Sequence, residues 1–526
     1  MNDRSRGLDQ EQSLGGPSKR PCHRAASAAS AAAAASGSGS GSGFAPSASD
    51  SDCNLRHRPG PAIAMEKVPG NLEGLRDRIR GLIYGCALGD AVGLATEFMT
   101  KAEAESTYKE LLSSRGEGSL LKPGDSVRDF HRSKWQPGDW TDDTDQLILI
   151  LNCLLPDVSA AANGVIDVDV DAEDFANAAV SKGTEDSWLA NHFKEPSARE
   201  FAGRLLRWHR KGFPELGDKS GCGMGRSTAR VVEDNQFSKD PSHVARLAWD
   251  RTGRCVAPNG ALMRAAASGL RGSQHAAADA KLFAETTHAD PRSTAACVAV
   301  AMAVAALLRS TTIEFSELTA LVLKEAEASL PLEQDLWKPA PPLWACAACT
   351  FENAAGSLSC EVCGTPKADD GAAGRVNAGF GVSWSAEEAS DKKYSRATAL
   401  IELRRAVLAT EALPKLDDAQ TMGYVNTCLA AGFHALRQAM EFCSGEKKPH
   451  HEQKEDAISK AAFFQKIVHN LTLEGGDADT NCAVAGALVG TYFGASNLPE
   501  EWLRLLPHRS FLHDLASRAA SLDEKK

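Results

Sequence analysis

Two short acidic motifs, more than three hundred residues apart, carry the residues of this chain that are best suited to chemistry. Residues 140–144 read Trp-Thr-Asp-Asp-Thr, and residues 475–481 read Gly-Gly-Asp-Ala-Asp-Thr-Asn. In each motif, closely spaced carboxylates and a threonine hydroxyl lie where an apolar helical run begins. Four carboxylates brought together would repel one another unless a cation neutralised them. If the fold unites the motifs, the expected ligand is Mg²⁺ or Mn²⁺, because these hard cations prefer oxygen donors.

Each motif by itself also has a purely structural explanation. Carboxylates in the first turn of a helix accept bonds from free backbone N–H groups and complement the helix dipole. The pair 142–143 would do this at the start of one helix. Asp477 and Asp479 would do it at the start of another. The two explanations are compatible, since a helix N-terminus holds oxygen ligands rigidly, and two such motifs in one chain favour a metal site.

The composition indicates a sizeable, aliphatic core. The 526 residues are 43% hydrophobic but only 6% aromatic, and the formal charge is −11. No nucleic-acid partner is expected, because a general nucleic-acid binder needs a basic face. The longest apolar run, Ala295 to Leu308, is shorter than the ~18–20 residues that a membrane-spanning helix requires. We interpret it as a buried helix and expect no membrane partner.

Cysteine usage predicts an intracellular reducing compartment, the cytoplasm or the nucleus. Of the 14 cysteines, four form a tight cluster and the rest are scattered. That pattern is typical of one metal site and not of a secreted disulfide framework. Residues 1–70 are rich in Ala, Ser and Gly and are predicted to be a disordered tail. Its basic residues leave organelle targeting as an alternative, against which its acidic residues and its lack of an amphipathic stripe count.

From about residue 72 the hydrophobic pattern is helical and convincing alternating strands are absent, so the predicted fold class is all-α. Leu75, Ile79, Leu82 and Cys86 follow the spacing of an amphipathic helix. Within that helix a glycine recurs every four residues from Gly81 to Gly93, which is typical of close helix–helix packing. Further helices are expected at 144–155, 293–308, 315–328, 396–412, 424–443, 458–470 and 480–493.

One proline-rich and cysteine-rich stretch, from Pro331 to about residue 395, interrupts the helical pattern. We interpret it as an insertion into a larger domain formed by residues 71–330 and 396–515, with a finger at 340–368 and a linker at 369–395. Its cysteines have the Cys-x₂-Cys…Cys-x₂-Cys spacing of a structural Zn²⁺ site with four thiolates. The predicted zinc ligands are Cys346, Cys349, Cys360 and Cys363.

The inserted segment is similar to the Ran-binding-protein type of zinc finger, in which a Trp and an Asn brace a small ribbon. It matches most closely the ubiquitin-binding Npl4 branch, which has a Thr-Phe pair after the second cysteine and an apolar residue between the last two. The resemblance implies that Thr350, Phe351 and Val362 bind ubiquitin. An exposed apolar pair on so small a module is consistent with a partner surface. RNA-binding relatives use arginines and stacking aromatics there, which this segment lacks.

Outside the insertion, about residues 72 to 510 resemble the ADP-ribosylglycohydrolase family, which includes the dinitrogenase-reductase-activating glycohydrolases. The resemblance rests on six motifs in order, at residues 80–98, 140–144, 221–225 (Gly-Cys-Gly-Met-Gly), 259–264 (Asn-Gly-Ala-Leu-Met-Arg), 287–291 (Thr-His-Ala-Asp-Pro) and 476–481. It implies an orthogonal all-α fold with two divalent ions, usually Mg²⁺, between these segments.

The family resemblance also implies roles for single residues. The implied metal ligands are Thr141, Asp142, Asp143, Asp477, Asp479 and Thr480. Glu97 would be a mobile acidic residue near the metals and the leaving group, and it forms the expected catalytic set with Asp143 and Asp477. Two ions can hold the vicinal hydroxyls of a ribose and position a water at its anomeric carbon. A nearby carboxylate then serves as general acid or base.

The substrate-binding residues are also taken from the resemblance. Gly221, Gly223 and Gly225 would offer backbone N–H groups to the diphosphate of ADP-ribose, although three glycines alone more often form a flexible turn. His288 would contact the ligand without binding a metal, whereas a lone histidine is more often structural. The motif that runs from Asn259 to Arg264 fits either a structural or a ligand-facing role at both of those residues.

Together these observations predict a metal-dependent hydrolase that releases ADP-ribose from a modified protein or from a small ADP-ribosyl compound. A ubiquitin-binding finger would bring it to its targets. One alternative is a non-catalytic adaptor that binds ADP-ribose and ubiquitin. Another is a hydrolase of the same fold that acts on an unrelated glycoside. The complete acidic set, with Glu97, counts against the adaptor, because a decayed active site would have lost a member.

Overall fold

The computed structural model describes residues 72–156, 192–332, 394–410, 412–445 and 458–521, together with Leu189, Asp335 and residues 344–345 and 352–353. Within these residues the regular structure is almost entirely helical, which confirms the all-α class. The predicted disordered tail at 1–70 and residues 369–393 of the predicted linker at 369–395 lie outside the described residues. So do the predicted zinc ligands Cys346, Cys349, Cys360 and Cys363 and the predicted ubiquitin-binding residues Thr350, Phe351 and Val362.

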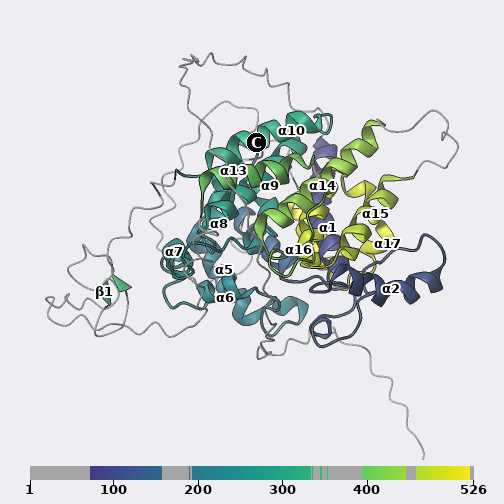
Figure 1. Ribbon diagram of the computed structural model, residues 1–526, viewed down its shortest axis with the longest axis horizontal. Coiled ribbons are helices and arrows are strands. Elements are labelled where there is room, and N and C mark those ends of the chain that lie inside the picture. The colour runs from purple at the N-terminus through teal and green to yellow at the C-terminus, as the bar shows by residue number, and fades with distance from the viewer. Residues whose placement is uncertain are drawn as a thin grey trace, which may run out of the picture.

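The helices are packed against one another around a common core (Figure 1). Their bounds are α1 Leu72–Gly93, α2 Lys101–Arg115, α3 Asp142–Leu154, α5 Ala198–Lys211, α6 Arg226–Val232, α7 Pro241–Arg251, α8 Ser273–Glu285, α9 Pro291–Arg309, α10 Phe315–Ala328, α13 Arg396–Leu408, α14 Val425–Ser444, α15 Lys460–Leu473, α16 Ala478–Phe493, α17 Glu500–Leu503 and α18 Arg509–Ala519. The helices expected from hydrophobic periodicity are all present, with ends shifted by a few residues.

Helix α1 and helix α16 lie in backbone contact, although they come from opposite ends of the chain (Figure 1). A Cβ built on Gly85 would lie 2.1 Å from the carbonyl oxygen of Gly486, and one on Gly89 would lie 1.9 Å from that of Cys482. The glycines every four residues therefore serve the close packing that the sequence predicts. Because Gly81 meets Gly490 and Gly93 meets Ala478, the helices are antiparallel, and the end of α1 lies beside the start of α16.

Local sequence signals fix where several helices begin. Before α2, Thr100 accepts a bond from the backbone N–H of Glu103, whose carboxylate accepts one from the backbone of Thr100, as in a capping box. Before α9, the Asp290 carboxylate accepts from the N–H of Arg292, and Pro291 occupies the first helical position. Both helices thus satisfy N–H groups that have no partner inside the helix.

Helix α9 crosses the core. At 19 residues it is longer than the apolar run in the sequence, and it meets the length and composition of a membrane-spanning helix. However, 94% of its apolar window is buried inside the protein. The interpretation of this segment as a buried core helix fits that burial.

The inserted stretch contains one described antiparallel backbone pair. Strand β1 (Trp344–Ala345) pairs with β2 (Glu352–Asn353), with Trp344 opposite Asn353 and Ala345 opposite Glu352. This pairing lies where the resemblance to a zinc finger implies a small ribbon.

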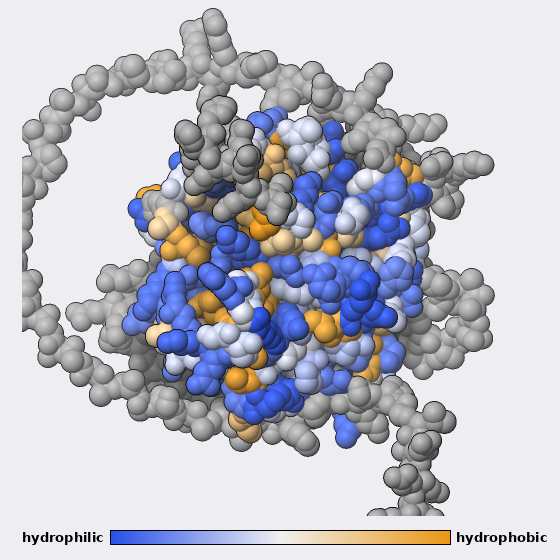
Figure 2. All heavy atoms as spheres, turned by 90° about the vertical axis from the view of Figure 1, so that its right-hand side faces the viewer, coloured by the Kyte–Doolittle hydropathy of each residue, from blue (hydrophilic) through white to orange (hydrophobic). Residues whose placement is uncertain are grey.

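The molecular face in Figure 2 carries hydrophobic residues in small patches that hydrophilic residues separate. Scattered exposed hydrophobic side chains are normal for a folded domain. Among the described residues, the large hydrophobic side chains that are most exposed are Phe130, Phe98, Ile401, Leu332, Ile458 and Leu505.

Candidate active site

The two acidic motifs meet at the adjoining ends of three helices. Asp142 and Asp143 lie in the first turn of α3, and the Oγ1 of Thr141 caps that helix by accepting from the backbone N–H of Asp143 at 3.3 Å. Asp477 precedes α16, whose first turn contains Asp479 and Thr480. The hydroxyl of Thr480 donates to Oδ1 of Asp143 at 3.3 Å, across 337 residues of sequence. The fold therefore unites the motifs, and helix capping and site formation occur together at α3.

The carboxylates of these motifs gather into two overlapping groups. Asp90, Asp143 and Asp479 present oxygen atoms within 4.8 Å of one another, and so do Glu97, Asp477 and Asp479. Burial, reinforced by repulsion between the carboxylates, raises the pKa of Asp143 and of Asp479 well above the usual range. Oδ2 of Asp143 is buried and has no hydrogen-bond partner. An orphaned carboxylate oxygen among other carboxylates fits a bound divalent cation.

Asp142 lies beside these two groups without belonging to either. Its Oδ2 accepts a bond from the side-chain amide of Gln146 at 2.9 Å. Its Oδ1 lies against Gly223, where a Cβ would come within 2.3 Å of it. Burial and the charges of Glu97 and its neighbours raise the pKa of Asp142 well above the usual range. This side chain therefore links the acidic cluster to the glycine loop.

Asp90 belongs to the cluster, and sequence reasoning gave it no role. Its carboxylate accepts bonds from the backbone N–H of Thr141 at 3.0 Å, from that of Thr144 at 3.0 Å and from the Thr144 hydroxyl at 2.6 Å. Burial raises the pKa of Asp90 to about 7. From α1 it thus fixes the first turn of α3. The signal in the sequence was a single carboxylate within the apolar second half of α1, from Gly81 to Gly93.

Glu97 lies in the turn after α1, and two residues missed by sequence reasoning hold it. Nε2 of His131 lies 2.5 Å from Oε2 of Glu97. The Arg132 guanidinium is buried and donates to the backbone carbonyls of Leu94 at 3.0 Å, Ala95 at 2.9 Å and Glu97 at 2.5 Å. A cation is favourable there, because the carbonyl end of a helix is negative. His131 and Arg132 therefore position Glu97 beside Asp477 and Asp479.

The residue after Glu97 has a strained backbone. Phe98 has a φ of 64°, in the left-handed region that costs a residue other than glycine about 1–3 kcal/mol. The Phe98 N–H donates to the carbonyl of Gly476 at 2.6 Å, and the Gly476 N–H donates to that of Met99 at 2.8 Å. This pair of bonds joins the Glu97 turn to the second acidic motif.

The glycine loop 221–225 lies against the acidic cluster, as the contact between Gly223 and Asp142 indicates. Gly223 has a φ of 103°, and Gly225 precedes α6. Gly221 differs from the prediction, because its N–H already donates to the carbonyl of Trp208 at 2.9 Å. The Trp208 indole in turn donates to Asp145 of α3 at 3.0 Å. Gly221 therefore anchors the loop, and its N–H is not free for a phosphate.

The family model for ADP-ribosylglycohydrolase matches residues 71–526. The chain belongs to the ADP-ribosylglycohydrolase family. It is also similar to a solved structure described as an "ADP-ribosylglycohydrolase-related protein complex", at 20% identity over 86% of this chain and 99% of that chain, with a TM-score of 0.45. No curated protein matched.

In this member of the ADP-ribosylglycohydrolase family, Arg264 connects Asp142 to His288. The buried guanidinium donates to Oε1 of Gln146, whose amide bonds Asp142, and to the hydroxyl oxygen of Thr287 at 2.5 Å. Thr287 Oγ1 lies 2.7 Å from Nδ1 of His288. Thr287 accepts from Arg264, and among the described residues no acceptor other than Nδ1 is in contact with its hydroxyl, so we assign the hydroxyl proton to the bond with Nδ1. The remaining proton of the neutral imidazole is then on Nε2.

His288 presents this Nε2–H as a buried donor without a hydrogen-bond partner. Burial and the nearby charge of Arg264 lower the pKa of His288 to about 3, so the ring is neutral at physiological pH. A Cβ on Gly260 would lie 3.3 Å from Nε2 and 3.0 Å from the hydroxyl of Thr228. The free donor suits an oxygen of a bound ligand, in agreement with the contact that the family resemblance implies.

Asn259 has a direct role as well. Its side-chain amide donates to Oδ2 of Asp477 at 2.9 Å, and its backbone N–H donates to the carbonyl of Gly423 at 3.1 Å. The sequence left Asn259 and Arg264 open between structural and ligand-facing roles. In the structure both position cluster carboxylates, Asn259 directly and Arg264 through Gln146.

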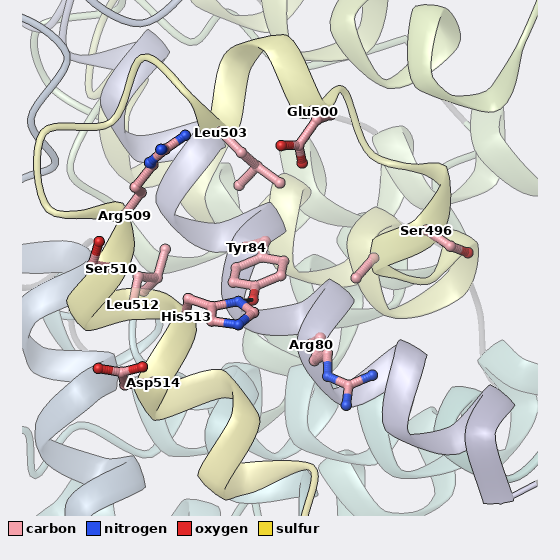
Figure 3. A pocket seen from close by; sticks show the side chains of 11 residues that line it. Arg80, Tyr84, Ser496, Glu500, Leu503, Arg509, Ser510, Leu512, His513 and Asp514 are labelled. Carbon is pink, nitrogen blue, oxygen red and sulfur yellow. Dashed lines mark hydrogen bonds between the residues drawn. The ribbon is translucent and has the colours of Figure 1, made fainter.

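Two surface pockets lie outside the acidic cluster. The larger, of about 610 Å³, is lined by α1, α17 and the start of α18 (Figure 3). Tyr84 and His513 lie against each other at its centre, with the Tyr84 hydroxyl 2.8 Å from Nδ1 of His513. The smaller, of about 270 Å³, lies between α13 and the start of α14. Neither is lined by a residue of the predicted active site.

We expect Gly223→Ala to lower kcat/KM for ADP-ribosyl substrates about 100-fold or more. A side chain is strained at a φ of 103°, and its Cβ would overlap Oδ1 of Asp142 at 2.3 Å. Steady-state kinetics checks this, with Gly203→Ala as the control, because a Cβ on Gly203 in α5 would meet nothing within 4 Å. Activity of Gly223→Ala within threefold of the wild type would show that the loop does not need to approach the cluster so closely.

Proposed function

We propose that this chain hydrolyses the glycosidic bond between ADP-ribose and a modified protein side chain, or a related small ADP-ribosyl compound, with divalent metal ions. Membership of the ADP-ribosylglycohydrolase family supports hydrolysis of ADP-ribose linkages. The observation that carries the metal dependence is the acidic cluster from α1, α3 and α16, with the orphaned Oδ2 of Asp143 inside it. Such a cluster is stable when a cation neutralises it.

The residues proposed to hold two Mg²⁺ or Mn²⁺ ions are Thr141, Asp142, Asp143, Asp477, Asp479 and Thr480. When bound, the ions supply positive charge for the vicinal hydroxyls of the ribose and for a water at the anomeric carbon. Asp90 and Asn259 keep this set in place through the bonds to α3 and to Asp477 described above.

Glu97 is proposed as the catalytic acid and base, with Asp143 and Asp477 completing the catalytic set. Its carboxylate lies with those of Asp477 and Asp479, where it can take a proton from the attacking water or give one to the leaving group. His131 and Arg132 orient the carboxylate and its backbone. The division of roles among the three carboxylates is part of the proposal.

The substrate's phosphates are proposed to bind at the glycine loop. The free backbone N–H groups at Gly223 and Gly225 suit a diphosphate, whereas that of Gly221 is used within the protein. The Nε2–H of His288 would donate to a further ligand oxygen. An uncharged donor fits this position, because the ring stays neutral at physiological pH.

A substrate panel tests the proposed hydrolysis. We expect Mg²⁺-dependent release of ADP-ribose from an arginine-linked peptide, a serine-linked peptide or a small ADP-ribosyl compound, and its loss in EDTA. Tight binding of ADP-ribose without turnover of any of these would instead indicate an adaptor. Turnover restricted to glycosides without ADP-ribose would indicate a different hydrolase of the same fold.

We extend the proposal to the inserted finger. Its four cysteines, Cys346, Cys349, Cys360 and Cys363, are proposed to hold one structural Zn²⁺, and the finger to bind ubiquitin through Thr350, Phe351 and Val362. The cysteine spacing and the backbone pairing of β1 with β2 support a small ribbon there. A finger that binds ubiquitin would bring the catalytic domain to ubiquitin-marked targets.

Replacing Thr350 and Phe351 together by alanine should weaken ubiquitin binding at least tenfold. An aromatic anchor such as Phe351 contributes much of the binding energy of an interface, and truncation removes that contribution. Hydrolysis of a small ADP-ribosyl compound should stay within twofold of the wild type. Titration of labelled ubiquitin with the full chain measures the first quantity, and Ile401→Ala on α13 serves as the exposed hydrophobic control. Unchanged ubiquitin affinity in the double variant would refute the proposed finger surface.

A further inference from the structure

Two unusually exposed aromatic side chains lie in the segments that form and hold the Glu97 turn. Phe130 is 80% exposed and Phe98 is 60% exposed, more than any other large hydrophobic side chain among the described residues. The Phe98 ring lies 5.1 Å from the ring of the half-buried His131, which lies 5.3 Å from the buried ring of Trp135. We call Phe98, Phe130, His131 and Trp135 the aromatic platform: the two phenylalanines form its open surface, and Trp135 lies beneath.

The platform adjoins Glu97 on one side and the glycine loop on the other. His131 contacts the Glu97 carboxylate at 2.5 Å. At the other end, Trp135 packs beside the glycine loop, where a Cβ on Gly223 would lie 3.2 Å from its ring. The platform therefore passes Glu97, the residue proposed to serve the leaving group.

Core packing does not account for the position of Phe98. Its backbone is held in the left-handed region by the two bonds with Gly476 and Met99, yet its side chain is directed to the surface. Strain of this kind persists where the surrounding structure imposes it, and it is frequent at functional sites. The fold thus holds an exposed aromatic ring next to the catalytic carboxylate.

The segment that carries Phe130, His131 and Trp135 is basic, although the chain as a whole has a net charge of −11 and the acidic cluster lies beside it. Residues 126–135 contain Arg128, Arg132 and Lys134, and their single carboxylate, Asp129, is bonded to Arg132. Nζ of Lys134 lies 5.9 Å from the ring centres of both Phe130 and Trp135. Exposed aromatic rings with the half-buried Lys134 ammonium beside them fit an extended polypeptide segment that carries acidic side chains.

We propose that the aromatic platform and Lys134 bind the polypeptide on which the ADP-ribosyl group is carried, with a preference for acidic residues beside the modified side chain. This inference rests on the proposed function. The leaving group in that reaction is the protein side chain, and Glu97 beside the platform is the residue that would protonate it. An adenine site would enclose both faces of the base, whereas Phe130 is open to solvent.

The test compares two substrates of the same linkage with the full chain. One is an ADP-ribosylated peptide with acidic flanking residues, and the other is the free ADP-ribosyl amino acid. Phe130→Ala should raise KM for the peptide about tenfold, as for the loss of one aromatic anchor, and change kcat/KM for the free compound less than twofold. Lys134→Glu should also raise KM for the peptide, by a factor that shrinks at high salt. Ile401→Ala should change neither.

Two results would overturn the platform proposal. If Phe130→Ala lowered kcat/KM equally for both substrates and free ADP-ribose inhibited the variant more weakly, the platform would bind the nucleotide. Unchanged kinetics for the peptide in both variants would show that it binds nothing in the reaction.

A binding measurement separates this proposal from the proposed hydrolysis. In a Glu97→Gln background with Mg²⁺, Phe130→Ala should weaken binding of the labelled peptide about tenfold and leave binding of free ADP-ribose unchanged. This comparison needs no turnover. If Phe130→Ala weakens peptide binding but the wild type hydrolyses neither substrate, the proposed hydrolysis is refuted and the platform is supported. If the wild type hydrolyses the substrates but Phe130→Ala leaves the peptide affinity unchanged, the platform is refuted and the hydrolysis is supported.

Discussion

Replacing Asp477 by Asn should lower kcat/KM for ADP-ribosyl substrates about 1,000-fold while leaving the helical fold intact. The change removes one charged oxygen ligand from the cluster that Asp477 forms with Glu97 and Asp479. Burial, and then repulsion from Glu97, already raise the pKa of Asp477 in the absence of metal. Loss of this carboxylate therefore relieves repulsion, and the metal-free variant should be at least as stable as the metal-free wild type.

Thermal unfolding with Mg²⁺ and with EDTA measures both parts of this expectation. The wild type should gain stability on adding Mg²⁺, because a ligand that binds only the folded state stabilises it. The variant should lose most of that gain without losing stability in EDTA. A variant that loses the Mg²⁺-dependent gain but keeps its stability in EDTA has lost a metal ligand, whereas a damaged fold would be less stable in EDTA as well.

Asp279→Asn is a suitable control, because Asp279 is a buried carboxylate outside the cluster. It accepts a bond from Arg271 at 2.9 Å, and burial raises its pKa to about 6. This variant should change stability but keep the full Mg²⁺-dependent gain and normal kinetics. An Asp477→Asn variant that retained wild-type activity would eliminate the metal site formed by the two motifs.

The acidic motifs could be predicted because their chemistry is local in the sequence. The carboxylates and threonines lie within a few residues of one another at helix starts, and both the capping and the ligand explanations use the same geometry. The apolar helices were equally visible, since α9 and α16 are buried along nearly their whole length. The glycines of α1 indicated close packing, although the partner helix had to come from the structure.

Helices α2 and α5 were not expected from the sequence, for different reasons. Helix α2 buries only Ala104 and Tyr108, so its hydrophobic stripe is almost absent. It forms because capping and tertiary contacts stabilise it, and periodicity alone does not reveal either. Helix α5 has a clear amphipathic stripe, since its buried Phe201, Leu205 and Trp208 recur at i, i+4 and i+7, and we overlooked it in the sequence.

The residues that position the catalytic carboxylates were hidden for a different reason. Asp90, His131 and Arg132 act through bonds to residues tens of positions away. Nothing in the spacing of His131 and Glu97 marks them as neighbours. For Gly221 the sequence suggested a free backbone donor, but the carbonyl of Trp208 takes that N–H. Side-chain identity thus indicated the ligands, while the supporting contacts depended on the tertiary fold.

Replacing Arg264 by Met should destabilise the protein by about 3 kcal/mol and lower kcat/KM about 100-fold. The buried guanidinium bonds the Gln146 amide oxygen and the Thr287 hydroxyl and stacks 5.0 Å from the Phe201 ring. Methionine fills similar space but leaves these buried acceptors without donors, and each such loss costs about 1–3 kcal/mol. Urea unfolding measures the stability.

The kinetic loss should follow from the two connections that Arg264 makes. Gln146 would no longer be oriented to donate to Asp142, and Thr287 could turn its hydroxyl away from Nδ1 of His288. Arg271→Met is the matched control, since Arg271 is also buried and pairs with Asp279, outside the cluster. It should lose comparable stability and keep normal kcat/KM at a temperature where it is folded. If both variants lost stability yet both kept normal kinetics, Arg264 would be a core residue with no part in positioning Asp142 or His288.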